Sequence, residues 1–240
     1  MKVRINRYLS MCGISSRRNA DELIAGGKVS VNGVVVNELG FRIDTETDEV
    51  RVGRKTLGFE RKRYVLLNKP RFYVTALGKG EDDKKTIDEL ITEIPERVYP
   101  VGRLDYDTEG LLILTNDGEL AHKILHPSYE LSKVYQATVR GKVNRDTLRR
   151  MRGGAELKDG YAMPDSINVI KYDDKETVIE IAFHEGRNRL VKRFLSEFRH
   201  PVLKLKRISV GPIKLDNVPR GGWRYFRADE LDALEKAVGR

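Results

Sequence analysis

One stretch, residues 99–118, constrains what this chain can fold into more than any other part of it. Its second half, Leu111–Thr115, is a short apolar run followed by Asn-Asp-Gly, a pattern that predicts a buried strand entering a tight turn. Its first half carries charged side chains of both signs, Asp105 among them, between Gly102 and Gly110. Polar loops on a rigid scaffold often carry the functional residues of a protein. We therefore expect a core sheet around Leu111–Thr115 and a functional site in the loop before it, with Asp105 as its leading residue.

Asp105 allows three interpretations from the local sequence. The first is structural, because an aspartate in a turn often caps backbone amides. The second is a calcium ligand, because residues 105–110 match the first half of a D-x-[DN]-x-[DN]-G loop. That loop needs a bidentate glutamate at its twelfth position, where this chain has Asn116, which argues against calcium. The third interpretation is a catalytic carboxylate.

Composition narrows the classes of partner. With 240 residues, 40% of them hydrophobic, the chain can hold one large domain or a large and a small one. Lysine and arginine outnumber acidic residues by 45 to 36, a net charge of +9 that favours a polyanionic partner such as nucleic acid. A solvated, salt-bridged surface is the alternative. The single Cys12 excludes a disulfide framework and a multi-cysteine zinc site.

Membrane, cofactor and metal signals are weak throughout. The start of the chain lacks the apolar segment of a signal peptide, and no run approaches the ~20 apolar residues of a membrane span. We expect a soluble, cytoplasmic protein with no membrane association. Because no G-x-G-x-x-G or phosphate-loop pattern is present, we expect no nucleotide cofactor. His122 and His126 lie four residues apart but lack a third ligand, so we expect no metal.

The first 61 residues predict a small module rich in basic residues. Residues 4–13 and 15–27 have the pattern of two short helices, and residues 29–36 alternate around Asn32-Gly33, a hairpin signal. A helix start that carries arginines favours bound anions. Ordinary exposed helix charges are the alternative. The candidate phosphate-binding residues are Arg4, Arg17, Arg18 and Lys28.

The rest of the chain alternates predicted strands with a few separated helices. Strands are expected at 64–67, 111–115, 132–139, 161–169, 176–183, 202–210 and 223–225. Helices are expected at 86–94, 119–125, 144–152, 190–195 and 229–238, and a turn at 171–175. Strands of antiparallel type with separated helices indicate the α+β class rather than a doubly wound sheet.

The central loop resembles the GRLDxxTxGL motif of the pseudouridine synthases, in the branch that modifies ribosomal RNA. The matching residues are Gly102, Arg103, Leu104, Asp105, Thr108, Gly110 and Leu111. Residues 4–33 resemble the S4 RNA-binding domain, and Asn68-Lys69-Pro70 and residues 184–195 are similar to further segments of the same family. The resemblance implies a small N-terminal α/β S4-like RNA-binding domain and linker in residues 1–61. It also implies a catalytic domain in residues 62–240, with a larger mixed, mainly antiparallel sheet and flanking helices.

The resemblance also implies roles for individual residues. The family's catalytic carboxylate falls on Asp105, and its base-stacking tyrosine falls on Tyr135, for which ordinary strand packing is the alternative. Lys192 stands where the family pairs an arginine with the carboxylate, and Leu190 replaces a glutamine. Lysine keeps the charge but loses the bidentate fork. The rival partners of the carboxylate are Arg187, Arg189 and Arg193, and the expected RNA contacts of this domain are Arg103, Arg187 and Arg189.

The implied reaction converts a specific uridine of ribosomal RNA to pseudouridine on a flipped-out base, without a cofactor, by a protein that acts as a monomer. Residues 102–110 and 115–121 look most like the B-type enzymes that act on large-subunit RNA, with the enzymes that act on small-subunit RNA as the nearest alternative. Two other classes remain open. One is a non-catalytic assembly factor that binds ribosomal RNA and keeps the fold. The other is a glycoside or nucleoside hydrolase that uses Asp107 or Glu109 as a second acid.

Overall fold

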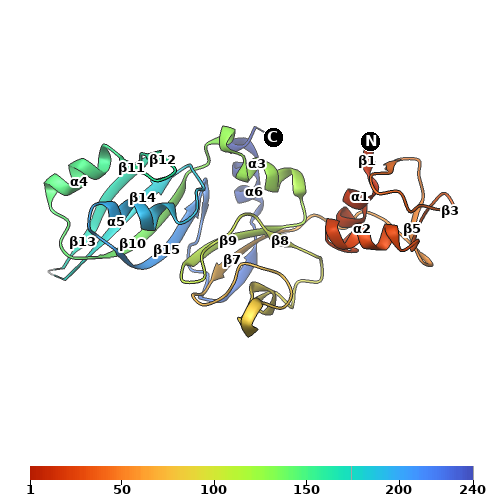
Figure 1. The fold of residues 1–240 in the computed structure, drawn as a ribbon, viewed down its shortest axis with the longest axis horizontal. Coiled ribbons are helices and arrows are strands. Elements are labelled where there is room, and N and C mark those ends of the chain that lie inside the picture. The colour runs from red at the N-terminus through yellow and green to blue at the C-terminus, as the bar shows by residue number, and fades with distance from the viewer. Residues whose placement is uncertain (174, 240) are drawn as a thin grey trace. The chain divides into compact units, whose positions relative to one another are not determined.

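The computed structural model describes residues 1–173 and 175–239, and these residues separate into two compact units (Figure 1). One unit comprises Met1–Arg63 with Pro95–Arg97, and the other comprises Tyr64–Ile94 with Val98–Arg240.

The N-terminal unit packs two helices on short strands. Its helices are α1 (Ile5–Met11) and α2 (Arg17–Ala25), and β1 (Lys2–Arg4) pairs antiparallel with β4 (Arg42–Asp44). A second sheet has the order β3 (Val34–Val35), β2 (Val29–Val31), β5 (Val50–Val52), β6 (Lys55–Thr56). The Ser16 hydroxyl accepts a hydrogen bond from the Asn19 amide at 3.2 Å, so Ser16 caps the start of α2. Leu9 and Ile24 are fully buried in the core of this unit.

A long mixed sheet forms the larger unit. In the described residues its order is β13-β14-β10-β15-β9-β7-β17, with β16 beside β15 and β8 beside β9. The strands are β7 (Tyr64–Lys69), β8 (Tyr99–Pro100), β9 (Glu109–Thr115), β10 (Lys133–Arg140), β13 (Ser166–Tyr172), β14 (Glu176–Phe183), β15 (Val202–Val210), β16 (Ile213–Lys214) and β17 (Trp223–Tyr225). Neighbouring strands pair antiparallel except β15 and β9, which pair in parallel. The predicted α+β class is confirmed.

Separate clusters of side chains bury the two halves of this sheet. One cluster joins β10 and β14 to α5 (Leu190–Glu197), and a second joins β9 to α3 (Gly118–Leu125) and α6 (Ala228–Ala237). The helix α4 (Arg145–Arg152) and the hairpin of β11 (Ala155–Leu157) with β12 (Gly160–Ala162) lie over the first half (Figure 1). Tyr135 of β10 packs against residues of both halves, and the halves meet where β15 pairs with β9.

Two predicted elements were wrong in extent. The helix expected at 86–94 is a single 3-10 turn, Ile87–Leu90, because the Ile87 amide donates to the Val74 carbonyl at 3.1 Å and holds the start of the segment extended. The strand expected at 161–169 is interrupted at residues 163–165, where Pro164 cannot donate to a sheet. It is divided between β12 and β13, and the hairpin partner β11 was not expected.

The turn expected at 171–175 is shorter than predicted. Strand β13 continues to Tyr172, which pairs with Thr177 of β14. Asp174, inside the predicted turn, lies outside the described residues.

Candidate active site

The loop that carries Asp105 leads directly into β9 and is shaped by two glycines. Gly102 and Gly110 both have positive φ angles, +78° and +109°. A Cβ at Gly110 would lie 2.2 Å from the Arg207 carbonyl oxygen, because β9 and β15 pair in parallel at this point. No other residue fits so close an approach of two backbones. The second glycine of the motif is therefore required by the sheet itself.

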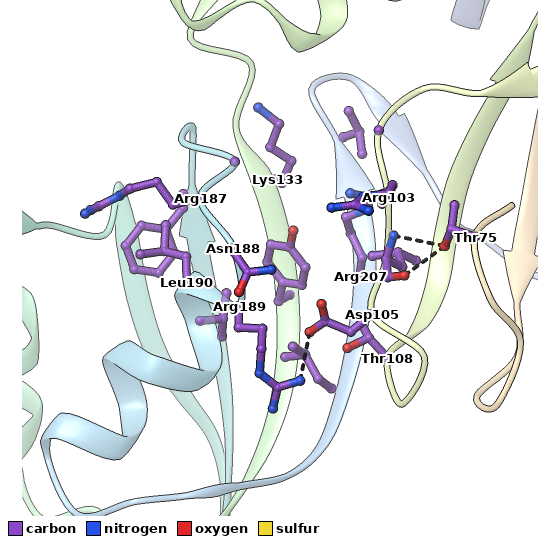
Figure 2. A pocket seen from close by; sticks show the side chains of 18 of the residues that line it. Thr75, Arg103, Asp105, Thr108, Lys133, Arg187, Asn188, Arg189, Leu190 and Arg207 are labelled. Carbon is purple, nitrogen blue, oxygen red and sulfur yellow. Dashed lines mark hydrogen bonds and ion pairs between the residues drawn. The ribbon is translucent and has the colours of Figure 1, made fainter. Parts of the chain in front are cut away.

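Lys69, at the end of β7, ties this loop down. Its side chain is fully buried, and its Nζ donates to the carbonyl oxygens of Pro70 at 3.1 Å, Asp105 at 3.2 Å and Thr108 at 3.0 Å. Burial lowers the pKa of Lys69 to about 8, although the Asp105 and Asp107 charges act in the opposite direction. Thr75 adds a second anchor, since its hydroxyl donates to the Leu104 carbonyl at 2.8 Å (Figure 2). The backbone around Asp105 is thus fixed before any substrate binds.

The Asp105 carboxylate pairs with Lys192, from the first turns of α5. Lys192 Nζ lies 2.9 Å from Asp105 Oδ2 and also donates to Asp107 Oδ1. Arg189 is more distant, with its Nη1 at 3.7 Å from Asp105 Oδ2 and 3.9 Å from Asp107 Oδ1 (Figure 2). Burial would raise the pKa of Asp107, but the hydrogen bond and charge of Lys192 outweigh it, so that this pKa lies below its usual range. Two carboxylates therefore share one ammonium group, with a guanidinium nearby.

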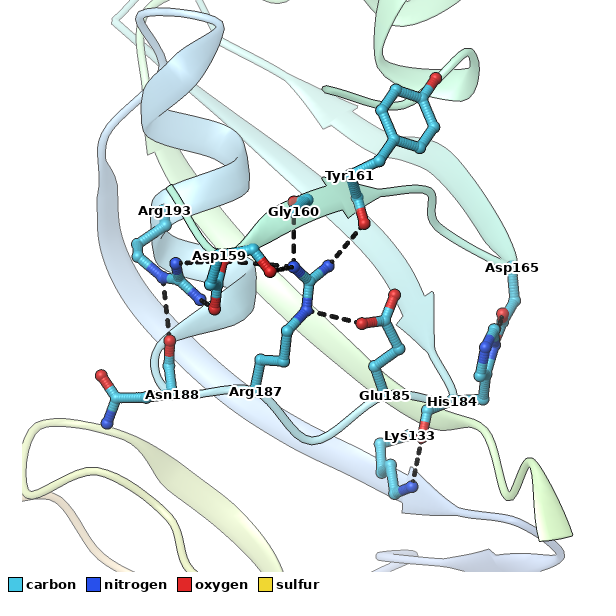
Figure 3. Close-up of polar contacts among 10 residues, drawn as sticks. All are labelled: Lys133, Asp159, Gly160, Tyr161, Asp165, His184, Glu185, Arg187, Asn188 and Arg193. Atoms are coloured by element: carbon cyan, nitrogen blue, oxygen red, sulfur yellow. Dashed lines mark hydrogen bonds and ion pairs between the residues drawn. The ribbon is translucent and has the colours of Figure 1, made fainter. Parts of the chain in front are cut away.

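Arg187 and Arg193, two of the rival partners of Asp105, bind elsewhere (Figure 3). Arg193 pairs with both oxygens of Asp159, at 2.7 and 2.8 Å. Arg187 donates to the carbonyls of Gly160 at 3.0 Å and Tyr161 at 2.9 Å, and its Nε lies 2.6 Å from Glu185 Oε2. These bonds fasten the β11–β12 hairpin to the segment that precedes α5. Their local effect is to hold the loop that presents Arg189.

A cavity of about 560 Å³ lies between the Asp105 loop, β10, β15 and the segment before α5 (Figure 2). Its walls combine apolar side chains, such as Ile113 and Leu205, with charged ones, as expected of a pocket for a small polar group. Tyr135, half-buried, lines it opposite Arg207 in the register of β10 and β15. Arg103 lines it from the loop and is exposed. The buried Thr108 hydroxyl also faces this region and has no hydrogen-bond partner in the described part of the chain.

A second, smaller cavity lies in the N-terminal unit. It has a volume of about 300 Å³, and its walls are mostly basic: Lys2, Val3, Arg4, Arg7, Arg17 and Arg42. Of the candidates from the sequence, Arg4 and Arg17 line it, whereas Arg18 and Lys28 are exposed outside it. A concave basic surface of this kind fits a phosphate group.

Several polar residues of the site were not singled out from the sequence as site residues. They are Lys69, Lys133 and Arg207. The signal for two of them was available in the strand patterns. Lys69 continues a run of core residues, and Arg207 follows Leu205 at the two-residue spacing of a buried strand face. A charge at such a position needs a partner, and the sequence does not identify it.

The described residues hold no group of three or more histidine, cysteine, aspartate or glutamate side chains placed to share a metal ion. The His122 and His126 rings lie 5.2 Å apart between centroids, on the exposed side of α3 and just beyond it. In the part of the chain that the structure describes, no helix is long and apolar enough to cross a membrane.

Comparison with known proteins gives consistent results over the whole chain. Residues 63–197 match the family described as RNA pseudouridylate synthase, and residues 3–50 match the S4 domain. An uncharacterized RNA pseudouridine synthase of Aquifex aeolicus is 58% identical, covering 100% of this chain and 96% of its own. The ribosomal large subunit pseudouridine synthase B of Bacillus subtilis is 40% identical, and the match covers 96% of this chain and 95% of that protein. A solved structure described as a pseudouridylate synthase superimposes with a TM-score of 0.66 at 27% identity, and the match covers 97% of this chain and 99% of that one.

Proposed function

The chain belongs to the RNA pseudouridylate synthase family and carries an S4 domain, and from this premise we propose that it converts a specific uridine of large-subunit ribosomal RNA to pseudouridine. The observation that carries the proposal is the Asp105–Lys192 pair in a cavity of about 560 Å³. The name of the Bacillus subtilis relative supports the large subunit as the source of the substrate. We place the protein in the cytoplasm, where that RNA is assembled. We also propose that it acts as a monomer.

The reaction is an isomerisation that needs no oxidant or energy source. The bond between N1 of uracil and C1′ of ribose breaks, the base rotates, and C5 of uracil bonds to C1′. The proton on C5 is then removed, and N1 gains one. A carboxylate beside C1′ can act as a nucleophile, or it can stabilise a positively charged sugar and remove a proton. Asp105 is the residue we assign to this role.

Lys192 prepares Asp105 for either route. An ammonium group 2.9 Å from the carboxylate holds it in one direction. The Lys192 side chain is 11% exposed, so water screens this pair less than it would a surface pair. Lysine thus takes the place of the family's arginine with a single charged contact instead of a fork.

The uridine must leave its base stack to reach this cavity. Tyr135 lines the cavity and can stack on the base, and Arg103 lies exposed at its edge, where it can contact the displaced strand. The basic cavity of the N-terminal unit would add phosphate contacts that position the RNA without taking part in the chemistry.

The decisive experiment incubates unmodified fragments of large-subunit ribosomal RNA with purified protein and no added cofactor or metal. We expect pseudouridine among the digested nucleosides. Asp105→Asn should abolish conversion while RNA affinity stays within about three-fold, because one polar group has changed at constant volume. Parallel loss of RNA binding would refute the catalytic assignment of Asp105. Tight binding without conversion by the unaltered protein would instead indicate an assembly factor, and release of free uracil would indicate a hydrolase.

A further inference from the structure

Arg207 is a buried charge with few partners. Its side chain lines the cavity, the residue is 7% exposed, and its Nε donates to the Leu111 carbonyl at 2.7 Å. Among the described residues, no carboxylate forms an ion pair with Arg207, and its two terminal nitrogens have no hydrogen-bond partner. Burial of an uncompensated guanidinium is costly unless an anion reaches it. The residues that the structure describes do not supply that anion as an ion-pair partner.

Two further cations line the same cavity, and neither forms an ion pair with a carboxylate of the described residues. Lys133 is partly buried on β10, and its Nζ donates to the carbonyl of His184 at 2.6 Å. Burial, together with the charge of Arg207, lowers the pKa of Lys133, although the charge of Asp165 acts in the opposite direction. Arg103 has no hydrogen-bond or ion-pair partner within the described ranges (Figure 2). Glu185 also lines the cavity, but it is already paired with Arg187.

Charge is therefore distributed unevenly within the site. Around Asp105 and Asp107, the cations Lys192 and Arg189 balance the two carboxylates. Around Arg207, none of the three positive groups forms an ion pair with a described carboxylate, and Asp165, whose charge reaches Lys133, already pairs with His184. The neutral carbonyl oxygens of uracil could accept one or two hydrogen bonds there, but they would not offset this charge. A phosphate would.

We propose that Arg103, Lys133 and Arg207 form a phosphate subsite, which binds a phosphodiester group next to the uridine that enters the cavity. The inference rests on the proposed function and deepens it. Arg207 lies directly opposite Tyr135 in the strand register, and Lys133 lies two residues before Tyr135 on β10. A base stacked on Tyr135 would therefore place its own backbone beside this subsite. The subsite would hold the nucleotide in its flipped position, where a single unstacked base has little else to retain it.

The first test measures RNA affinity against salt concentration. The probe is the large-subunit ribosomal RNA fragment that the full-length protein binds most tightly, and all proteins carry Asp105→Asn so that the bound RNA is not converted. Arg207→Gln and Arg103→Gln should each weaken binding and reduce the slope of log affinity against log salt by about one, as expected for one lost phosphate contact. Lys204→Gln is the matched control, because Lys204 is an exposed cation of β15 that does not line the cavity. An unchanged slope for both cavity variants would overturn the subsite.

The second test identifies the phosphate. Single uncharged methylphosphonate linkages are placed on either side of each uridine in the same fragment. The protein with Arg207 intact should lose about ten-fold in affinity at one such linkage, whereas Arg207→Gln should lose no more than two-fold there. Equal losses in both proteins would mean that Arg207 contacts the base and not the backbone.

The stability of each variant and the conversion of RNA are measured separately from RNA binding, so that a loss of binding is not confused with unfolding or with loss of activity. Arg103 is exposed and unpaired in the described structure, so Arg103→Gln should melt with the parent protein even if Arg207→Gln is less stable. Conversion is measured with the unaltered protein, in which Asp105 is intact, and its failure to convert RNA would refute the proposed function. The binding slopes would still decide the subsite.

Discussion

A single ammonium group controls two carboxylates at the centre of this site. Lys192 contacts both Asp105 and Asp107, and no other described lysine forms an ion pair with either. In such an arrangement, we expect the positive charge to matter more than the shape of the group that carries it. The departure of this chain from the family's arginine is therefore compatible with catalysis.

Substitution of Lys192 tests this view. Lys192→Met should lower the single-turnover rate by about 100-fold, because two partly buried carboxylates would lose their main counter-charge. The rate of Lys192→Arg should stay within about five-fold of that of the unaltered protein, because arginine keeps the positive charge and can form two parallel hydrogen bonds to a carboxylate. Single-turnover conversion of ribosomal RNA is the measurement, with Lys204→Met as the control for loss of a lysine. Equal losses for the Met and Arg variants would contradict the electrostatic role.

Lys69 predicts an alkaline limit to activity. Its pKa is lowered from 10.5 to about 8, so the ammonium form that binds three carbonyls is lost as the pH rises through about 8. Between about 8 and 10.5 the unfolded chain binds more protons at this residue than the folded chain does, so deprotonation of Lys69 does not destabilise the fold. We expect kcat to fall above pH 8 while the unfolding midpoint shows no parallel loss from this group. A flat profile of kcat up to about pH 9.5 would show that the loop does not need the charge.

At the scale of elements, the site depends on the parallel contact between β9 and β15. Antiparallel pairing joins the other neighbouring strands of the order described above, so this contact is where the two halves of the sheet meet. It places the Asp105 loop, which precedes β9, beside Tyr135 and Arg207, which pair across β10 and β15. Gly110 makes the approach of the two backbones possible.

Gly110→Ala should therefore destabilise the whole domain. The added methyl group would overlap the Arg207 carbonyl and the backbone would remain at a positive φ, so we expect a loss of about 3 kcal/mol or more in unfolding free energy. Urea unfolding followed by circular dichroism measures it. Gly186→Ala is the control, because a Cβ there meets no atom within 4 Å. A Gly110→Ala protein as stable as the control would mean that the strands can separate at this point without cost.

At the scale of the whole molecule, we expect the basic N-terminal unit to contribute RNA binding and the larger unit to contribute the chemistry. The cavity lined by Arg4 and Arg17 is in a unit with its own buried core, which suggests that it can be removed without disturbing the sheet. The proposed division at residues 61 and 62 defines the truncation to make.

Removal of residues 1–61 should weaken RNA binding and make conversion depend more strongly on the RNA that surrounds the target uridine. A protein that loses four or five phosphate contacts should bind more weakly by roughly 10- to 1000-fold near physiological salt. Filter-binding with long and short fragments, together with conversion of each, measures both effects. Arg4→Gln with Arg17→Gln in the full chain is the milder counterpart. Unchanged affinity after truncation would assign RNA binding to the catalytic unit alone.

The sequence by itself determined what depends on local pattern. The alternation of apolar and polar residues predicted strands such as 176–183 and 202–210, because side chains on a strand point to opposite faces in turn. The glycine-bounded loop led to the prediction that Asp105 is catalytic, because all residues of that motif lie close together in the sequence. Where the local pattern gave the wrong extent, as for the helix expected at residues 86–94, a contact with Val74 decided the structure.

Only the tertiary structure decided which charges meet. Asp105 and Lys192 are 87 residues apart, and Lys69 reaches carbonyls up to 39 residues away. Sequence spacing shows that a polar residue will be buried, but its partner depends on how β9 and β15 come together. Arg187, Arg189, Lys192 and Arg193 are equally charged neighbours in the sequence, and the geometry of α5 alone separates the partner of Asp105 from the residues that hold Asp159. Electrostatic pairing falls steeply with distance, so differences of a few ångströms that no sequence pattern records decide the chemistry of the site.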